Sequence, residues 1–393
     1  MQIIIMALLH LLYILQYSSL LSFAMLNPID FLALQLIRKS LHDMPGSNFF
    51  SSWDFTSDPC NFSGVYCDAG RVISLNLGDP RANSPGLIGH IHPAIGDLSS
   101  LAEFTVVPGK IYGTLPSTIS MLHNLKFLGI SRNYISGEIP PSLSQIRGIR
   151  TIDLSFNILT GKIPPAVAAL PSLSNFIVCR NRLTGSIPRF TSQTLTRLDL
   201  KRNSLSGSIS IDSLPSSLQY LSLSWNQLDG SLEKVLIRLN KLNYLDLSMN
   251  RFTGTIPGSL FSSPISNLLL HRNLFTGTIR PVHQVTIQTV DLSFNRLIGE
   301  ISPLFSDVEN LYLNNNMFGG EIPTGLINGV LDGRIHVLYV QHNYLSGMKM
   351  NPMAKIPVRS SVCLQYNCMV PPVQAACPVK AGIQKTRPMS QCV

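Results

Sequence analysis

Short stretches of alternating apolar and polar residues recur along the chain, and each is followed by an asparagine, an apolar residue and a glycine. One unit, residues 149–164, reads I-R-T-I-D-L-S-F-N-I-L-T-G-K-I-P. Its first half predicts a strand with one buried face, and its Gly and Pro predict that the chain then turns back. The pattern returns every 21 to 27 residues, at Asn133, Asn157, Asn181, Asn203, Asn226, Asn250, Asn273, Asn295, Asn316 and Asn343.

A unit of this size cannot bury its own apolar row, so successive units must stack on one another. Asparagine carries both donors and acceptors, and we expect its side chains to bond backbone groups of their own and neighbouring turns. Two less regular units precede the array, starting at Val72 and Leu101. The pattern predicts an α/β repeat solenoid of about 12 repeats with a parallel sheet on its concave side.

The second half of many units reads L-x-G-x-I-P, with Ile or Phe also found at the first position. Examples are Ile135–Pro140, Leu159–Pro164, Leu183–Pro188, Phe252–Pro257 and Phe318–Pro323. This motif resembles the plant-type extracellular leucine-rich repeat family, which includes receptor-like kinases, receptor-like proteins and polygalacturonase-inhibiting proteins. The resemblance implies a leucine-rich repeat horseshoe with a helical N-terminal cap and a Cys-rich C-terminal cap.

Cysteines gather in the two flanks of the array: Cys60, Cys67, Cys363, Cys368, Cys377 and Cys392. This distribution predicts disulfide-stapled caps in an oxidising compartment. The four C-terminal cysteines allow three pairings. The spacing does not fit a zinc site, and we expect no metal and no cofactor. Cys179 stands alone on the array, where a free thiol, an unreactive residue buried between turns and an intermolecular disulfide are all open.

Four segments follow from these patterns: a signal peptide over 1–24, an N-terminal cap over 25–70, repeats over 71–347 and a basic Cys-rich cap over 348–393. Residues 3–24 are apolar, and Ser22-Phe23-Ala24 fits a cleavage site. We therefore expect a secreted protein of the extracellular space or cell wall, without membrane insertion once the signal is removed. An uncleaved anchor is the alternative. No kinase domain is expected in the short segment after the array. Asn61 begins the sequon Asn-Phe-Ser and is the expected glycosylation site.

A helix is predicted to begin at Asn27-Pro28, as cap and first position. Its apolar residues recur at helical spacing and predict the face that covers the open end of the stack. These residues are Ile29, Leu32, Ala33, Leu36 and Ile37. In the cap that follows, Trp53 is expected to pack on the first strand.

Counting back one, two, four and six residues from each Asn locates the side chains expected to point outward from the strands. Twelve turns give a face about 55 Å long, which suits a polymer or protein rather than a metabolite. The face combines aromatic and basic residues with Asp153, Asp199, Asp246 and Asp291, although Asp in L-D-L-S also has a structural interpretation. The candidate ligand-binding residues are Arg132, Phe156, Arg180, Lys201, Arg202, Tyr220, Trp225, Tyr244, His271, Arg272, Phe294, Tyr312 and Tyr339. Arg182, in the sequence Arg180-Asn-Arg182, could also receive a carboxylate.

The formal net charge is +9, and residues 333–393 contain seven Lys or Arg and no acid. Such a tail can adhere to a polyanion, for which pectin is the candidate partner, or it can be an ordinary soluble cap. Nucleic acid is not expected as a partner, because the chain is expected to be secreted and the interleaved Asp residues interrupt any basic stripe along the array. The sequence carries no H-E-x-x-H, G-x-S-x-G or P-loop motif, so no catalytic residues and no enzyme activity are expected.

These features favour a secreted, non-catalytic recognition protein that binds an extracellular protein or peptide on its concave face. The setting would be apoplastic signalling or defence, with presentation of the ligand to a receptor kinase ectodomain. One alternative is inhibition of a wall-degrading polygalacturonase, which rests on family analogy. Another is a structural wall protein held on pectin by its basic tail.

Overall fold

The computed structural model describes residues 26–79, 81, 85–351, 354–371, 377–378, 382 and 384–392. The predicted signal peptide over 1–24 lies outside the described residues. In the part of the chain that the structure describes, no helix is both long and apolar enough to cross a membrane.

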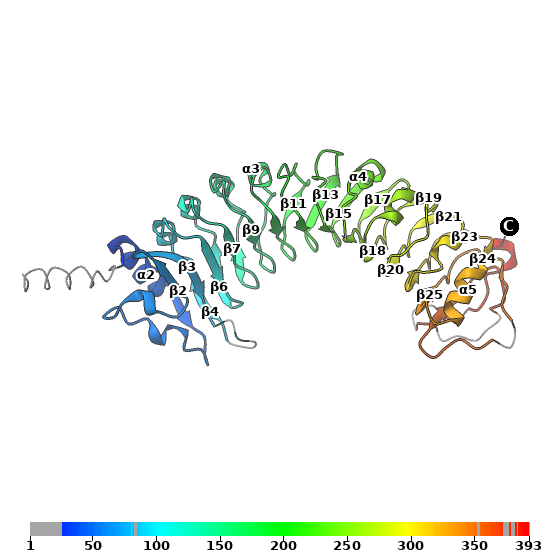
Figure 1. Ribbon diagram of the computed structural model, residues 1–393, viewed down its shortest axis with the longest axis horizontal. Coiled ribbons are helices and arrows are strands. Elements are labelled where there is room, and N and C mark those ends of the chain that lie inside the picture. Colours follow the sequence, from blue (N-terminus) through cyan, green and yellow to red (C-terminus); the bar gives the residue numbers. More distant parts are fainter. Residues whose placement is uncertain are drawn as a thin grey trace, which may run out of the picture.

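The chain forms a curved stack of turns with one long sheet on its inner side (Figure 1). The described strands of this sheet are all parallel except for the first pair. In order they are β2 (Val65–Asp68), β3 (Arg71–Leu77), β5 (Glu103–Val106), β7 (Phe127–Gly129), β9 (Thr151–Asp153), β10 (Asn175–Ile177), β12 (Arg197–Asp199), β14 (Tyr220–Ser222), β16 (Tyr244–Asp246), β18 (Asn267–Leu269), β20 (Thr289–Asp291), β22 (Asn310–Tyr312), β25 (Val337–Tyr339) and β27 (Ser361–Cys363). The predicted solenoid with a parallel sheet is confirmed.

After each inner strand the chain forms a second short strand or extended segment, and many turns then continue into a short helix. The second strands pair with one another in small sheets: β1 (Leu41–Asp43), β4 (Leu87–His90), β6 (Lys110–Thr114) and β8 (Tyr134–Ser136); β11 (Thr184–Gly185), β13 (Ser204–Ser208), β15 (Gln227–Ser231) and β17 (Arg251–Thr253); β19 (Thr276–Thr278), β21 (Arg296–Glu300) and β23 (Met317–Gly319); β24 (Glu321–Ile322) and β26 (Gly347–Met348).

Short helices complete the outer side of the stack (Figure 1). They include α3 (Pro165–Ala168), α4 (Glu233–Arg238), α5 (Thr324–Leu331) and the 3₁₀ turns η3 (Pro93–Asp97), η4 (Ser117–Met121), η5 (Pro141–Gln145), η6 (Gly258–Ser262) and η7 (Pro303–Phe305). Between the two sides, the leucine, isoleucine and phenylalanine positions of all turns form one continuous buried core. The apolar period of the sequence therefore becomes a single core that runs the length of the stack.

The asparagines form the expected ladder. Asn250, for example, accepts a hydrogen bond on Oδ1 from the Leu228 N–H of the preceding turn (3.1 Å). Its Nδ2 donates to the Leu223 carbonyl of that turn (2.9 Å) and to the Leu247 carbonyl of its own turn (3.2 Å). Each asparagine thus satisfies backbone groups that the tight turn would otherwise leave buried and unpaired.

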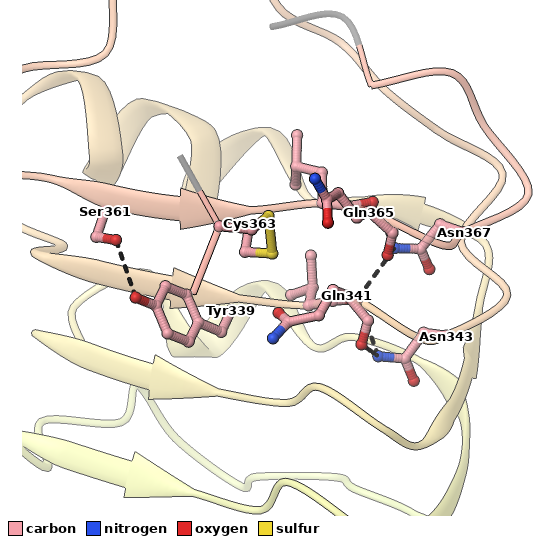
Figure 2. The surroundings of a disulfide bond; sticks show 10 residues. Tyr339, Gln341, Asn343, Ser361, Cys363, Gln365 and Asn367 are labelled. Carbon is pink, nitrogen blue, oxygen red and sulfur yellow. Dashed lines mark hydrogen bonds between the residues drawn. A yellow bond between two sulfur atoms is a disulfide. The ribbon is translucent and has the colours of Figure 1, made fainter. Parts of the chain in front are cut away.

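The array runs one turn beyond the predicted end at 347. Strand β27 pairs with β25 in parallel, and Asn367 extends the ladder by accepting from the Leu345 N–H (3.1 Å) and donating to the Val340 carbonyl (3.0 Å). Figure 2 shows Asn343 and Asn367 in equivalent places on neighbouring turns, with Cys363 at the end of β27. Part of the segment predicted as a C-terminal cap is therefore a repeat.

The N-terminal helix α2 (Pro28–Ser40) begins where predicted, with the Asn27 side chain accepting from the Ile29 N–H. The predicted contact face is partly wrong, because Ile29 and Leu32 are 58% and 57% exposed. A salt bridge rotates the helix: Asp30 is fully buried, and its carboxylate accepts two bonds from Arg71 (both 3.0 Å) and one from the Val72 N–H (2.9 Å). Ala33 and Ile37 lie in the contact as expected, whereas Leu36 is 39% exposed.

The cap behind this helix is an aromatic cluster rather than a single contact on the first strand. It includes η1 (Phe49–Ser52) and η2 (Pro59–Asn61). Trp53 is 6% exposed, lies 5.4 Å from Phe62 in a stacked arrangement and donates its indole N–H to the Ser63 carbonyl (3.0 Å). The Cys60–Cys67 disulfide closes the same region, as predicted. The cap is therefore a packed unit joined to the sheet.

Two disulfides staple the other end, Cys363–Cys377 and Cys368–Cys392. The structure thus selects one of the three pairings that the sequence left open. The last short helix, η9 (Met389–Gln391), lies beside the second bridge. Arg387 is held between Tyr344 and Tyr366, at 4.0 and 4.6 Å from their ring centres, and donates to the Asn343 carbonyl (3.0 Å). The final segment is therefore folded back onto the last turns.

Candidate ligand-binding surface

The predicted ligand-binding residues divide into a floor and an edge. Tyr220, Tyr244, Tyr312 and Tyr339 lie in inner strands and form the floor. Lys201 and His271 lie just beyond strand ends. The remaining seven are the residues immediately before an Asn: Arg132, Phe156, Arg180, Arg202, Trp225, Arg272 and Phe294.

The residue before each asparagine has a left-handed backbone conformation that the sequence did not predict. From Arg132 to His342 its φ lies between 53° and 57°, a region that residues other than glycine rarely adopt. The conformation follows each inner strand, where the chain bends into the next side of the turn. It places the row of side chains that precede the asparagines at one edge of the sheet.

Arginines and aromatic rings stack on one another along this edge. The guanidinium carbons of Arg132 and Arg180 lie 4.4 and 4.9 Å from the centre of the Phe156 ring. Arg202 lies 4.7 Å from the Trp225 ring, and Arg272 lies 4.2 Å from Phe294. Each ring restrains a cation that stays exposed to solvent, so fewer side-chain conformations must be lost when a ligand binds.

Three further arginines follow an asparagine directly, and two of them, Arg251 and Arg296, were not among the sequence-based candidates. Arg182, Arg251 and Arg296 are exposed. Together with Arg132, Arg180, Arg202 and Arg272 they form what we call the basic edge. Among the described residues, no acidic side chain lies within 4.0 Å of any of these seven guanidinium groups. A count on both sides of each Asn would have revealed the set.

Two tyrosines in the middle of the floor ionise less readily than a free tyrosine. Tyr220 and Tyr244 stack with ring centres 4.5 Å apart, and Arg197 covers Tyr220 at 3.9 Å. Burial, followed by the nearby Asp199 and Asp246 carboxylates respectively, raises the pKa of Tyr220 and of Tyr244 to about 12. At neutral pH both phenols therefore remain protonated and can donate a hydrogen bond.

The aspartates of the floor are structural rather than outward-facing. Asp199 and Asp246 are only 2% and 8% exposed. Asp246 accepts from the N–H (3.1 Å) and hydroxyl (2.6 Å) of Ser248, and Asp153 and Asp291 make the equivalent bonds. Asp199 instead lies 3.4 Å from Lys201, and burial raises its pKa. The acids thus lock their own turns, and the accessible charge of the surface is basic.

Aromatic and amide side chains line the C-terminal part of the floor. Tyr312 and Tyr339 meet edge to face with ring centres 5.4 Å apart, and the Tyr339 hydroxyl lies 3.0 Å from that of Ser361. Gln341 and Gln365 lie side by side on the last two turns (Figure 2). Here the surface changes from basic to neutral and polar. His271, which lies nearer the N-terminus just beyond β18, is 3.1 Å from Asp291.

Cys179 is a free thiol that is 3% exposed. Burial, followed by the Asp199 carboxylate, raises the pKa of Cys179 to about 11. The thiolate, which is the reactive form, is therefore scarce at neutral pH. Of the three options open from the sequence, the structure favours the unreactive buried residue.

The geometry, together with family models, defines the class of protein as a leucine-rich repeat solenoid. The model of the leucine rich repeat N-terminal domain matches residues 27–68. The model of the leucine rich repeat itself matches residues 124–146, 148–170, 217–239 and 241–263. Within that class, the chain is similar to plant receptor-like proteins.

Receptor like protein 22 of Arabidopsis thaliana is 35% identical over 143 residues, which are 35% of this chain and 18% of that protein. Receptor-like protein EIX2 of Solanum lycopersicum is 30% identical over 130 residues, which are 32% of this chain and 12% of that protein. The match to these relatives therefore covers less than a fifth of their length.

Two solved structures cover most of this chain. The structure of PEPR1–AtPEP1 aligns with a TM-score of 0.61 and 25% identity, covering 86% of this chain and 55% of the other. A plant ice-binding protein aligns with a TM-score of 0.58 and 27% identity, covering 85% of this chain and 99% of the other.

Proposed function

We propose that this chain is a non-catalytic recognition protein that binds an extended, acidic peptide or protein segment along its basic edge. The setting is the plant extracellular space, in signalling or defence. The observation that carries the proposal is the set of seven exposed arginines without an acidic partner among the described residues. Exposed arginine and aromatic side chains are the groups most often responsible for binding energy at interfaces.

The dimensions of the edge fit an extended chain. Arg132 and Arg296 precede and follow asparagines that are seven turns apart, which corresponds to about 34 Å at the spacing of neighbouring strands. An extended peptide of roughly ten residues spans that distance. Carboxylates on such a peptide can pair with guanidinium groups in a bidentate manner, and Trp225, which is 47% exposed, offers a ring near the middle.

The kinship with receptor-like proteins and the likeness to PEPR1 in its complex with AtPEP1 support a peptide or protein partner. Presentation of the bound segment to a receptor kinase ectodomain is the corresponding mode of action. The C-terminal tail offers less free charge than its composition implies, because Arg334 pairs with Asp307 (2.7 Å), Lys349 pairs with Glu321 (3.2 Å) and Arg387 is held between two tyrosines. Polygalacturonase inhibition has no structural observation that favours it.

Site-directed photo-crosslinking tests the proposal. A photoreactive phenylalanine analogue replaces Trp225 in one protein and Val282, which is 61% exposed outside the basic edge, in a matched control. Both proteins are incubated with plant extracellular fluid, irradiated and analysed by mass spectrometry. We expect an acidic peptide or protein that is captured only at 225 and released by high salt before irradiation. Capture of the same species at both positions, or of a basic partner, would contradict the proposal.

A second candidate function is suggested by rows of hydroxyl side chains on the small outer sheets. The residue after the outer glycine is Ser or Thr in five successive turns, Ser186, Ser208, Ser231, Thr255 and Thr278, and all five are exposed. Ser208, Ser231, Thr255 and Thr278 each pack over the glycine of the following turn, where a Cβ would collide with them. The row is therefore held at a regular spacing of about 4.8 Å.

A regular hydroxyl row suits a periodic solid surface, and a plant ice-binding protein shares this fold over almost its whole length. An ice-recrystallisation assay with the purified protein tests this candidate. If it is right, Thr255→Lys combined with Thr278→Lys abolishes growth inhibition, whereas Arg180→Glu with Arg202→Glu leaves it intact. Unrestricted growth of ice crystals in the presence of the wild-type protein would eliminate it.

A further inference from the structure

A polar pocket lies where the N-terminal cap meets the first inner strands. These strands, β2 and β3, lie at the N-terminal end of the sheet (Figure 1). Its volume is about 590 Å³, within the range of small-molecule sites. The cap contributes Asn48 and Ser63, and the strands contribute Tyr66, Asn76 and Glu103. The basic edge begins at Arg132, just after β7, the strand next to β5, and no residue of that edge lines the pocket, so the two sites are separate.

Rigid backbone frames this pocket. Gly64 approaches the sheet so closely that a Cβ on it would lie 2.0 Å from the Asn76 carbonyl oxygen, and its own carbonyl accepts from the Asn76 N–H (2.7 Å). The φ of Gly64 is 78°, which glycine adopts without strain. The Cys60–Cys67 disulfide and the Trp53 cluster hold the cap side. The cavity is therefore pre-formed, which lowers the entropic cost of binding.

Uncharged hydrogen-bonding groups dominate the lining. Thr105 donates its hydroxyl to the Asn76 Oδ1 (2.6 Å), which fixes the amide so that its Nδ2 remains available as a donor. Ser63 and Ser52 pair through their hydroxyls (2.9 Å) at the cap side. Asn48 and Ser51 add further amide and hydroxyl groups. Such a set matches a ligand with many hydroxyl groups, because each hydroxyl can both donate and accept.

One carboxylate and one aromatic ring complete the chemistry. Glu103 makes no ion pair with any described residue, and two hydroxyls of one ligand can donate to its two oxygens. Among the described residues of the lining, the other charged groups are Asp79 and Arg81, which pair with each other. Tyr66 is 55% exposed, and the face of its ring can contact the C–H groups of a sugar. An anionic ligand would be repelled by Glu103.

We propose that this pocket binds a neutral sugar residue, as a free oligosaccharide or as part of a glycan. The stacked ring is Tyr66, the hydroxyl acceptor is Glu103 and the amide donor is Asn76. The site is independent of the proposed peptide-binding edge, and either function can fail without the other.

The test is a binding titration of the purified full chain by calorimetry and saturation-transfer NMR. The neutral probes are cellotetraose, xylotetraose, mannotetraose and galactotetraose, and the charged probes are tetragalacturonate and triglycine amide. We expect one-to-one binding of at least one neutral probe. Tyr66→Ala and Glu103→Gln should each weaken it by about tenfold, the loss of one good contact.

Tyr112→Ala is the matched control, because Tyr112 is 53% exposed on the outer strand β6 and lies outside the pocket. It should leave the affinity unchanged, and thermal unfolding of every variant verifies its fold. If Tyr66→Ala unfolds the cap, the Glu103→Gln variant alone decides. The proposal is overturned if no neutral probe binds, if only a charged probe binds, or if the Tyr112 variant weakens sugar binding as much as the pocket variants.

Discussion

Removing one side chain of the asparagine ladder should destabilise the stack far more than its size implies. Asn250→Ala deletes an acceptor for the Leu228 N–H and a donor to the Leu223 and Leu247 carbonyls, at a residue that is 9% exposed. A typical hydrogen bond contributes about 1 kcal/mol, and a buried group left unsatisfied costs about 1–3 kcal/mol. Because alanine reaches none of these groups, we expect a loss of about 3–4 kcal/mol.

The assay is urea unfolding combined with native-state hydrogen exchange. Neighbouring repeats of a solenoid can open separately, so the exchange rate of the Leu228 amide reports the local effect more directly than a global midpoint. Asn243→Ala is the control, because Asn243 is exposed and uses only its backbone carbonyl to bond the next turn. A loss below about 1 kcal/mol for Asn250→Ala, or equal losses for both variants, would refute a structural role for the ladder.

Three further outcomes follow from buried groups. Asp30→Asn should lower the free energy of unfolding, measured in urea, by about 3 kcal/mol, because it leaves Arg71 without its counter-charge. No change would show that the cap does not need the ion pair. Cys179 should resist iodoacetamide at pH 7.5 and react faster as pH rises toward its pKa of about 11, followed by mass spectrometry; rapid labelling of the folded protein at pH 7.5 would contradict its burial. Tyr220 and Tyr244 should ionise near pH 12 in an ultraviolet titration of the folded protein. Because the phenols of the unfolded chain ionise near pH 10, the contribution of these tyrosines to stability should fall as pH rises from about 10 to 12. Ionisation of both near pH 10 in the folded protein would contradict the stacked, half-buried arrangement.

Much of the fold follows from the sequence because one short pattern repeats. The spacing of asparagines such as Asn157 and Asn181 fixes the turn length, and the apolar alternation fixes which side of each strand is buried. The Cys60–Cys67 pair was predictable because the two cysteines are neighbours in a cap. The extra turn at Asn367 was hidden because a cysteine occupies a strand position in its V-C-L-Q-Y-N sequence, which was assigned to the cap.

Other features depend on contacts that no local pattern reveals. The rotation of α2 follows from the burial of Asp30 against Arg71, 41 residues away. Apolar periodicity alone placed Ile29 in the contact, although it is exposed. The left-handed conformation of the residue before each Asn, such as Arg132, is a property of the closed turn and not of arginine. It is nevertheless what brings guanidinium groups onto aromatic rings along one edge.

The accessible charge of the surface also could not be predicted from a local sequence pattern. Reading alternate residues gave a floor with interleaved aspartates, but Asp246 bonds Ser248 within its own turn. Conversely, Arg251 and Arg296 were missed because they follow an Asn and mainly the residues before each Asn were counted. Which charges remain free depends on side-chain pairing in three dimensions. The sequence therefore predicted most arginines of the basic edge, but only the structure showed that they have no acidic partner among the described residues.

A fluorescence titration measures directly whether the basic edge binds an acidic peptide. Trp225 is 47% exposed and Trp53 is 6% exposed, so changes in emission on binding report mainly on the edge. The probe is a twelve-residue peptide of alternating Glu and Gly, compared with one of alternating Lys and Gly. The edge variant carries Arg132, Arg180, Arg182 and Arg202 each replaced by Glu. The control variant carries the same change at Arg147, Arg150, Arg189 and Arg280, which are exposed outside the basic edge.

We expect saturable binding of the acidic peptide alone, weakened by added salt, abolished in the edge variant and retained in the control variant. Equal weakening in the two variants would show that net charge, rather than the arginine edge, attracts the probe. Undiminished binding by the edge variant would contradict the account.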